Sequence, residues 1–365
     1  HKAREGGYEG AMYPWESTDT GEETTPRWTN PEPDGTRIRI WTGDTEQHIS
    51  SDVTYAVMQY WRWTGDEDFF VNCGAEIVLD TAVFWGSRVK YNAAQDRYEL
   101  DMQIGPDEYH ENINNSVFTN SIVRWHLRTA LSVLKWLEEK HSAKADDLRS
   151  RLGLSAKRLA HWQDVADKMF IPQDKDRGIL EQFEGFFKLE RVPLEYWAPR
   201  TTPMDAILGH EAIQHIMIIK QADVVMLMAL LGEEFGPQED RLRNWKFYYP
   251  LVDHGSSLSP STHAWVAARL GLLDDALREF LYAAAIDLED AKGNVRDGIH
   301  GAAAGGLWEA ATFGFAGLHV KGDTFTVDPH LPEHWRSLTF HVNFRGQQHT
   351  VHLAREAESV KAGAD

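Results

Sequence analysis

Apolar residues recur at helical spacing along most of the chain. Between residues 51 and 63 they stand at Val53, Tyr55-Ala56-Val57, Tyr60-Trp61 and Trp63, the spacing expected of one face of a helix. The same spacing predicts further helices at 66–92, 120–141, 154–169, 211–231, 262–270, 274–285 and 302–315. The pattern therefore predicts a mainly α fold.

Long loops rich in polar and aromatic residues separate these helices. They span residues 13–43, 103–119, 174–209 and 250–261. Loops of this length inside a compact domain are usually functional. We therefore expect a helical toroid with an active site at one mouth.

The pattern changes after Gly317. Phe325 and Val327, and then the stretch from Leu338 to Phe344, alternate with polar residues, which is typical of strands. A turn at 345–347 separates them from a second alternating stretch. We therefore divide the chain into a helical catalytic domain, residues 1–320, and the start of a C-terminal β-sandwich-like domain, residues 321–365.

The composition narrows the classes of partner. Hydrophobic residues make up 42% of the chain, enough for a large core, and the formal net charge is −19. Such a charge disfavours nucleic acids and anionic membranes as partners, although its simplest meaning is solubility. The single cysteine, Cys73, excludes an intrachain disulfide and fits a cytoplasmic protein, although a cysteine-poor secreted enzyme would look the same. The 14 tryptophans are compatible with a carbohydrate site, but large cores also use tryptophan.

The most conspicuous segment is Gly105-Pro106-Asp107-Glu108-Tyr109-His110-Glu111-Asn112. It crowds three carboxylates and a histidine into one loop. Inverting cleavage of a glycosidic bond needs a protonated carboxyl group to supply a proton to the leaving oxygen, and neighbouring carboxylates and burial favour that form. Helix capping and surface charge explain the same residues equally simply.

Five motifs together resemble glycoside hydrolase family 65. They are Met12-Tyr13-Pro14-Trp15-Glu16-Ser17-Thr18-Asp19-Thr20-Gly21-Glu22-Glu23, the segment from Gly105 to Glu111 with Asn114-Asn115, Lys220-Gln221-Ala222-Asp223, Gly255-Ser256-Ser257-Leu258-Ser259-Pro260-Ser261, and Gly298-Ile299-His300. Maltose, kojibiose, nigerose and trehalose phosphorylases belong to this family. The resemblance implies an (α/α)6 barrel that is incomplete at its N-terminus.

The resemblance also implies a role for each matching residue. Glu108 matches the general acid, with Glu111 as its rival. Lys220 and Gln221 match the pair that holds the transferred glucosyl unit, whereas a lysine on an apolar helix would otherwise be read as a snorkelling surface residue. Trp15 and Glu16 are expected to line the sugar site. A core tryptophan and a helix-capping carboxylate are the alternatives for these two.

The resemblance places phosphate at Ser256, Ser257, His300 and Gly301. Hydroxyls, backbone N–H groups and an imidazole suit an oxyanion, although an ordinary capped turn would explain the serine segment as well. The family often has a serine three residues after the position of His300, where this chain has Ala303. One hydroxyl of the phosphate site is therefore expected to be missing.

The implied reaction is inverting phosphorolysis of an α-linked glucosyl disaccharide to β-glucose 1-phosphate and a free sugar. It needs no metal or other cofactor, because inorganic phosphate is the co-substrate. One alternative is an inverting hydrolase, for which Asp253 is the nearby candidate base. Another is an inactive sugar-binding fragment, since the upstream Trp-Asp motif and the N-terminal β-sandwich of the family are not in this sequence. We therefore expect a homodimer or association with that missing segment.

Overall fold

The computed structural model describes residues 1–31, 35–198 and 202–355. The chain divides into two compact units. The first unit comprises His1–Trp61 and Asp66–Ser256, and the second comprises Arg62–Gly65 and Ser257–Asp365. The predicted fold class, mainly α with β structure towards the C-terminus, is confirmed. The end of the predicted β domain, 356–365, lies outside the described residues.

The first unit is built from helices and short hairpins. Its helices are α1 (Lys2–Glu5), α2 (Thr42–Thr45), most of α3 (Ile49–Thr64), α4 (Glu67–Phe69), α5 (Ala75–Arg88), α6 (Val117–Lys140), α7 (Ser142–Leu152), α8 (Ala156–Lys168), α9 (Met204–Leu208), α10 (His210–Ile213), α11 (Val224–Leu231) and α12 (Gln238–Tyr248). Its strands are β1 (Lys90–Asn92) paired with β2 (Arg97–Glu99), and β3 (Gln173–Asp174) paired with β4 (Ile179–Leu180).

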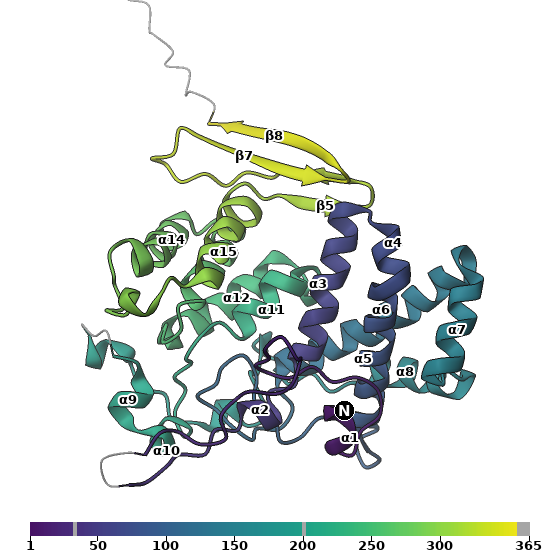
Figure 1. The fold of residues 1–365 in the computed structure, drawn as a ribbon. Helices are drawn as coiled ribbons and strands as arrows, with labels where there is room; N and C mark the ends of the chain where they lie inside the picture. The colour runs from purple at the N-terminus through teal and green to yellow at the C-terminus, as the bar shows by residue number, and fades with distance from the viewer. Residues whose placement is uncertain (32–34, 199–201, 356–365) are drawn as a thin grey trace, which may run out of the picture. The chain divides into compact units, whose positions relative to one another are not determined.

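Serine caps fix where two central helices begin. The Ser116 side chain accepts a hydrogen bond from the backbone N–H of Thr119 at the start of α6, and Ser155 accepts from Arg158 at the start of α8. Such a cap satisfies one of the N–H groups that a helix leaves unpaired at its N-terminus. These helices pack against each other and against α5, and Figure 1 shows α5, α6, α7 and α8 grouped together.

A buried histidine connects three helices of the first unit. His126 on α6 lies within hydrogen-bonding distance of Ser51 and Thr54 on α3 and of Thr81 on α5. Burial lowers the pKa of His126 to about 4, because the apolar surroundings disfavour the charged ring. A neutral imidazole with hydroxyl partners thus fixes α3 against α5 and α6.

Two predicted helices are corrected by the structure. The helix predicted at 66–92 contains a π-helical segment, Phe70–Gly74, and ends at Arg88; the following residues form β1 because Tyr91 pairs with Tyr98 across the hairpin. The helix predicted at 211–231 is broken between α10 and α11. There the backbone turns to pair with other segments, as in the parallel bridge between Ile219 and Val252. A buried irregular segment and a buried helix are equally apolar, so the pattern could not separate them.

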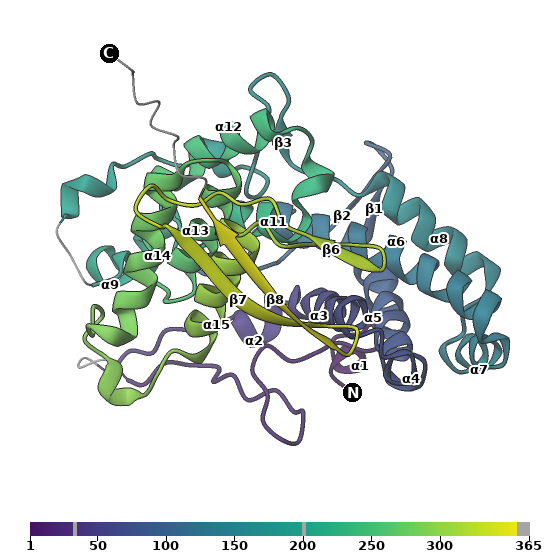
Figure 2. The same ribbon diagram turned by 90° about the horizontal axis from the view of Figure 1, so that it is seen from above.

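The second unit combines helices with two hairpins. Its helices are α13 (Ser259–Arg269), α14 (Leu273–Leu288), α15 (Gly301–Glu309) and a π-helical continuation, Ala310–Phe315; its strands are β5 (His319–Lys321), β6 (Thr324–Thr326), β7 (Ser337–Phe344) and β8 (Gln347–Ala354). The predicted alternation in β7 is confirmed, since Phe340, Val342 and Phe344 are buried between exposed neighbours. Figure 2 shows β7 and β8 side by side, and their pairing is antiparallel.

Glycine is required where the chain leaves the last helix for the first of these strands. Gly317 has a φ of 61°, and a Cβ at this position would lie 2.1 Å from the carbonyl oxygen of Asp328. No side chain fits at that distance. The approach closes a small core of Phe340, Val342 and Val351 with their neighbours.

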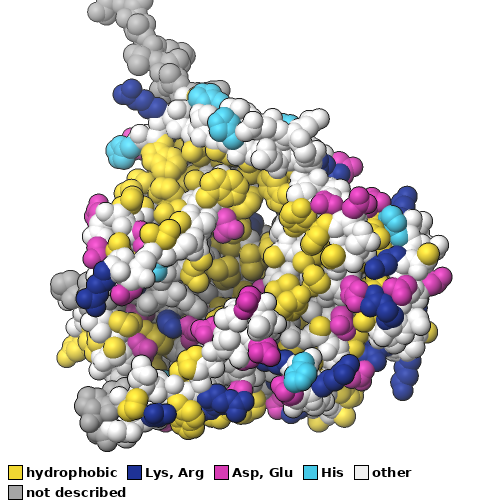
Figure 3. Space-filling model, in the orientation of Figure 1, with side chains coloured by type: hydrophobic (Ala, Val, Ile, Leu, Met, Phe, Trp, Pro, Cys, Tyr) yellow, Lys and Arg dark blue, Asp and Glu magenta, His cyan; other side chains and the backbone are white. Residues whose placement is uncertain are grey.

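Two further features are the charged surface and one helical stretch that is long and apolar enough to resemble a membrane span. Figure 3 shows Lys and Arg side chains interspersed with Asp and Glu side chains, and histidines gathered over the β7–β8 hairpin. Of the described residues, only Glu67–Arg88 form a helical stretch with the length and apolar composition of a membrane span, and 56% of its most apolar window is buried inside the structure. That burial is expected of a helix in a packed core.

Candidate active site

The loop with the predicted acid and the loop with the predicted sugar ligands meet in the first unit. The ammonium of Lys220 lies 2.5 Å from Oε2 of Glu108. Both side chains are partly buried, with exposed fractions of 28% and 20%. Burial works against the charge on Lys220, but the charge of Glu108 and the hydrogen bond to it raise the pKa of Lys220. The predicted acid and one of the predicted sugar ligands therefore form an ion pair that solvent can reach.

The carboxylate of Asp107 fixes both of these loops. Its carboxylate accepts the backbone N–H of Lys220 at 2.8 Å and that of Tyr109 at 3.2 Å. It also accepts from the side-chain amide of Gln182 at 2.7 Å, and a ring nitrogen of His110 lies 2.6 Å away. Asp107 is buried. One carboxylate thus fixes the backbone on both sides of the Glu108–Lys220 pair.

A second buried carboxylate explains the glycine that opens this loop. Asp223 accepts the backbone N–H of Asp107, and a Cβ on Gly105 would lie 2.9 Å from the Asp223 carboxylate. Burial, together with the charge of Asp107, raises the pKa of Asp223 to about 8. Gly105 is thus needed for close approach rather than for an unusual backbone angle.

The glycine–serine segment begins beside the same ion pair. The backbone N–H of Gly255 donates to the carbonyl of Lys220 at 2.9 Å. A Cβ on Gly255 would lie 3.0 Å from the Tyr109 hydroxyl and 3.3 Å from Cγ of Lys220. Ser256, the last residue of the first unit, follows directly. The structure therefore brings the first predicted phosphate ligand close to the predicted sugar ligands.

Gln221 makes a contact that the sequence did not indicate. Its side-chain amide donates to the carbonyl of Pro106 at 2.5 Å. Pro106 lies two residues before Glu108, so Gln221 supports the loop of the acid. The amide oxygen is the group that it could offer to a sugar hydroxyl.

Trp15 and Glu16 lie in an irregular turn between α1 and α2. The ring of Trp15 packs edge-on against the ring of His48, with centroids 5.6 Å apart. His48 in turn lies between two carboxylates, with Glu46 at 3.2 Å and Asp52 at 2.6 Å. Trp15 is partly buried and Glu16 is exposed. Neither residue lies in the core, whereas the alternative interpretation required Trp15 to be buried there.

The Glu46–His48–Asp52 group is electrostatically coupled to the ion pair. Burial opposes the charge on His48, but Asp52 and Glu46 raise its pKa to about 10. Burial raises the pKa of Glu46 to about 8, with a contribution from Glu108 and opposition from His48 and Lys220. Glu46 Oε2 is buried without a hydrogen-bond partner among the described residues. Within this group, Glu46 is thus the residue whose charge is coupled to the Glu108–Lys220 pair.

The remaining predicted phosphate ligands belong to the second unit. Ser257 lies in the turn before α13 and is half-buried. His300 precedes Gly301, the first residue of α15. A ring nitrogen of His300 lies 2.7 Å from the carboxylate of Asp287, which also accepts the backbone N–H of His300. Asp287 thus fixes the imidazole at the start of α15.

Sequence reasoning did not predict the supporting residues. Asp107 stands inside the motif that was singled out, and Glu46 with His48 and Asp52 could have been noticed from the spacing of two and four residues. Their roles depend on contacts between residues far apart in the chain, which spacing does not reveal.

Comparison with known proteins identifies the family of this chain. The sequence description "Glycosyl hydrolase family 65 central catalytic domain" matches residues 1–309, and the description "Glycosyl hydrolase family 65, C-terminal domain" matches residues 318–365. The chain belongs to glycosyl hydrolase family 65. The fold of this family's catalytic domain is an (α/α)6 barrel, so the catalytic domain of this chain has that fold.

Several relatives within this family are similar over almost the whole chain. A kojibiose phosphorylase from Halothermothrix orenii is 41% identical over 98% of this chain and 46% of its own length. A 1,2-α-glucosylglycerol phosphorylase from Bacillus selenitireducens is 36% identical over 98% of this chain and 48% of its own length. An α,α-trehalose phosphorylase from Thermoanaerobacter brockii is 32% identical over 97% and 44%, respectively.

A solved structure shares the fold. It is described as a candidate kojibiose phosphorylase from the human microbiome, with a TM-score of 0.85, 29% identity, and coverage of 97% of this chain and 50% of that chain. The chain thus spans about half the length of the relatives that it matches.

Proposed function

We propose that the protein is an inverting α-glucoside phosphorylase. It would convert an α-linked glucosyl disaccharide and inorganic phosphate into β-glucose 1-phosphate and a free sugar. The observation that carries the proposal is the Glu108–Lys220 pair, fixed on one buried carboxylate beside the start of the glycine–serine segment. The names of its relatives agree, since they are phosphorylases of glucosides.

In the proposed reaction Glu108 is the general acid. Glu108 is the carboxylate of an ion pair that solvent can reach, so it first takes up a proton from solvent. This proton passes to the glycosidic oxygen as the bond from that oxygen to the anomeric carbon breaks, and a phosphate oxygen forms a new bond to the same carbon from the opposite face. The configuration at that carbon inverts. Phosphate arrives as an anion, so no second carboxylate is needed to activate the nucleophile.

Lys220 is proposed to bind the glucosyl unit while it stays in contact with Glu108. An ammonium has three N–H donors, and among the described residues its contact is with Glu108. The other two can bind sugar hydroxyls. Since Lys220 is half-enclosed and fixed through its backbone, its donors are held in a preset direction, which lowers the entropic cost of orienting the sugar.

Phosphate is proposed to bind Ser256, Ser257, His300 and the backbone N–H of Gly301. The Asp287 carboxylate orients the imidazole of His300 towards the proposed phosphate. The start of α15 adds the positive end of a helix dipole. Ala303, buried in α15, takes the position at which relatives often carry a serine, so we expect fewer hydroxyl contacts to phosphate.

The hydrolase alternative is weakened by the contacts of Asp253. A hydrolase would need a base to activate water. The Asp253 carboxylate is buried and accepts from the Tyr109 hydroxyl and from the backbone N–H of Met204 at 2.9 Å. Both bonds are to Oδ2 of Asp253, and they tie this carboxylate to the loop around Glu108.

We propose further that the enzyme uses no metal or organic cofactor and works in the cytoplasm, where its free and exposed cysteine, Cys73, would stay reduced. Association with a second copy or with a further segment stays a prediction. Size-exclusion chromatography with light scattering would test it, because a second copy or segment adds its mass to the 41.6 kDa of this chain.

Phosphate release decides between the proposed activity and its alternatives. The protein is incubated with β-glucose 1-phosphate and a panel of acceptor sugars that includes glucose, glycerol and maltose, and inorganic phosphate is measured. Release that depends on one acceptor, with a new glucoside of that acceptor, supports the proposal. Release of glucose from disaccharides in phosphate-free buffer would establish the hydrolase, and sugar binding without turnover would establish the inactive fragment.

A further inference from the structure

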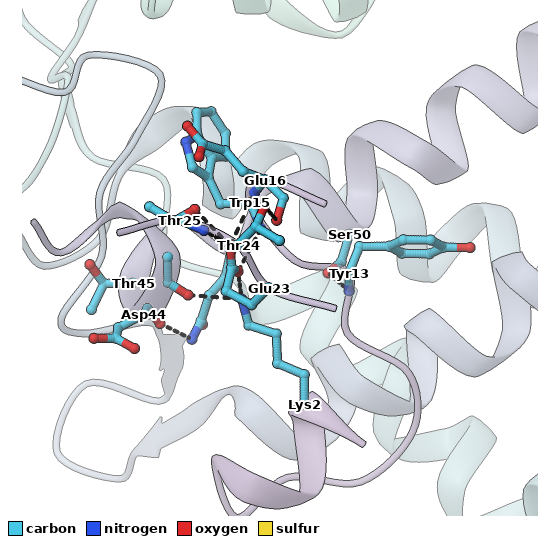
Figure 4. A network of polar contacts seen from close by, with 12 residues as sticks. Lys2, Tyr13, Trp15, Glu16, Glu23, Thr24, Thr25, Asp44, Thr45 and Ser50 are labelled. Atoms are coloured by element: carbon cyan, nitrogen blue, oxygen red, sulfur yellow. Dashed lines mark hydrogen bonds and ion pairs between the residues drawn. The ribbon is translucent and has the colours of Figure 1, made fainter. Parts of the chain in front are cut away.

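A single carboxylate ties down the turn that presents Trp15 and Glu16. Figure 4 shows Glu23 at the centre of this network. Its Oε2 accepts the backbone N–H of Trp15 at 2.8 Å and its Oε1 accepts that of Glu16 at 3.1 Å. The hydroxyl and backbone N–H of Thr25 donate to Oε1 as well, at 2.6 and 3.2 Å. Both oxygens are thus directed at the backbone of the predicted sugar-site residues.

A lysine joins this carboxylate to two helices. The ammonium of Lys2, on α1, pairs with Glu23 Oε2 and donates to the carbonyl of Gly43, on α2, at 2.8 Å. A Cβ on Gly43 would lie 2.9 Å from Cβ of Thr25 and 3.4 Å from the carboxyl carbon of Glu23. Because Gly43 lacks that atom, α2 packs directly onto the Glu23 turn.

Regular secondary structure does not hold Trp15 in place. Among the described residues between α1 and α2, pairing is limited to isolated bridges, such as that between Ser17 and Glu23. Two contacts hold Trp15 itself: its backbone N–H donates to Glu23, and its ring packs against His48. The carbonyl of the next residue, Glu16, also accepts from the backbone N–H of Thr24 at 2.9 Å.

The charge of Glu23 persists throughout the working pH range. Burial alone would raise its pKa, but hydrogen bonds from Lys2, Thr25, Trp15 and Glu16 outweigh that effect and lower the pKa to about 2. Hydrogen bonds to an ionised acceptor are about twice as strong as those between neutral groups. An amide of the same shape would lose the charge, and its NH2 group would face donors.

We propose that Glu23, together with Lys2, is a positioning residue for the sugar site. It fixes the backbone of Trp15 and Glu16 so that the aromatic face and the carboxylate meet the disaccharide in one orientation. Glu23 has no part in the chemical step and none in phosphate binding. The inference rests on the proposed function for the meaning of "disaccharide", but its structural basis, the Glu23 network, is independent of it.

The test compares Glu23→Gln with Glu22→Gln, which removes an exposed carboxylate from the neighbouring residue. With kojibiose as the probe, Glu23→Gln is expected to raise KM for the disaccharide about tenfold, which corresponds to one lost charged hydrogen-bond network of modest strength. KM for phosphate and kcat should change less than about threefold. Glu22→Gln should match the wild type.

Lys2→Met tests the same link from the other side. It should raise KM for the disaccharide in the same direction, and the double variant Lys2→Met/Glu23→Gln should cost less than the sum of the two, because the residues act through one contact. If Glu23→Gln does not fold, Thr25→Val, which removes only the hydroxyl donor, should still give the selective rise in KM. Equal rises in both Michaelis constants, or no rise in either, would overturn the proposal.

Calorimetric titration with glucose separates this inference from the proposed function. If the wild type binds glucose but shows no phosphorolysis, the proposed function fails, and weaker glucose binding by Glu23→Gln would still support the positioning role. If phosphorolysis is present, and Glu23→Gln and Lys2→Met both bind glucose as the wild type does, only the positioning role fails.

Discussion

The backbone N–H of Lys220 donates to the carboxylate of Asp107 at 2.8 Å, although 113 positions separate the two residues. The proposed sugar ligand is therefore fixed to the residue directly before the proposed acid. Every contact of this carboxylate among the described residues is to a group of the active-site loops or their support.

Asp107→Asn tests that connection. The amide keeps the shape, but its NH2 group would face N–H donors, and a buried unsatisfied donor costs about 1–3 kcal/mol. We expect kcat to fall about a hundredfold, because the acid and the sugar shift relative to each other, with a measurable fall in Tm. Steady-state kinetics and calorimetry check both values. Asp146→Asn, an exposed residue on α7, is the matched control, and unchanged kcat in Asp107→Asn would contradict the role.

Glu108→Gln is expected to lower kcat for phosphorolysis of a disaccharide by about a hundred- to ten-thousand-fold, since it removes the general acid. The fold should be unchanged. The loss should be much smaller with α-glucosyl fluoride, whose leaving group needs little protonation.

Glu111→Gln is the control for this acid, because Glu111 is a neighbouring carboxylate that contacts His210 at 3.1 Å. Near wild-type turnover in Glu108→Gln together with loss of turnover in Glu111→Gln would reverse the assignment.

Ser257→Ala and His300→Ala are expected to weaken phosphate use. The apparent KM for phosphate should rise at least about tenfold, as expected for loss of a charge-assisted hydrogen bond of about 1.5–3 kcal/mol, while KM for the disaccharide changes little. Initial rates over a grid of both substrates give the two constants. Ser150→Ala, on the exposed side of α7, should behave as the wild type. Full activity with phosphate rigorously removed would favour the hydrolase.

Thermal stability is expected to fall as pH rises from mildly acidic to alkaline values. Glu46 titrates at about 8 in the folded chain, against an ordinary value of 4.5, and His48 at about 10, against 6.5. As the pH rises, each of these two groups therefore releases its proton at a lower pH in the unfolded state than in the folded state. Raising the pH through these windows therefore favours unfolding, because stability falls wherever the folded state binds more protons.

Tm measured between about pH 5 and about pH 9.5 checks the sign of this dependence. Glu46→Gln removes one of the two protons, so its Tm should fall less steeply up to about pH 8, the value of Glu46 in the folded chain. A wild-type Tm that rises over the same range would contradict the prediction.

The helices and the C-terminal hairpin were predictable because their patterns are local. Strand β7 shows the expected alternation. Helix α3 lies where the apolar spacing predicted a helix, but of the predicted apolar positions only Val57 is buried, and its other buried residues are Ser50, Ser51, Thr54 and Met58. The segment around Lys220 was wrongly predicted as helix, because its apolar neighbours, Ile216, Ile218 and Ile219, are buried in an irregular segment. Periodicity reports burial on one side and says little about a segment that is buried all round.

The motifs led to Glu108 and Lys220, but not to what holds them. The contact between these two side chains is seen only in the structure. The supporting carboxylates, Asp107 and Glu23, act on backbone N–H groups. Such contacts depend on where the chain passes rather than on which residue types it carries, so no local signal announces them.

The hydrogen bond from Gly255 N–H to the Lys220 carbonyl makes the proposed phosphate segment and the proposed sugar segment mechanical neighbours. If phosphate shifts the glycine–serine backbone, it shifts the ammonium of Lys220 with it. Binding of the two substrates is then thermodynamically linked, and linkage is reciprocal. If bound phosphate changes the dissociation constant of the sugar by some factor, bound sugar must change the dissociation constant of phosphate by the same factor.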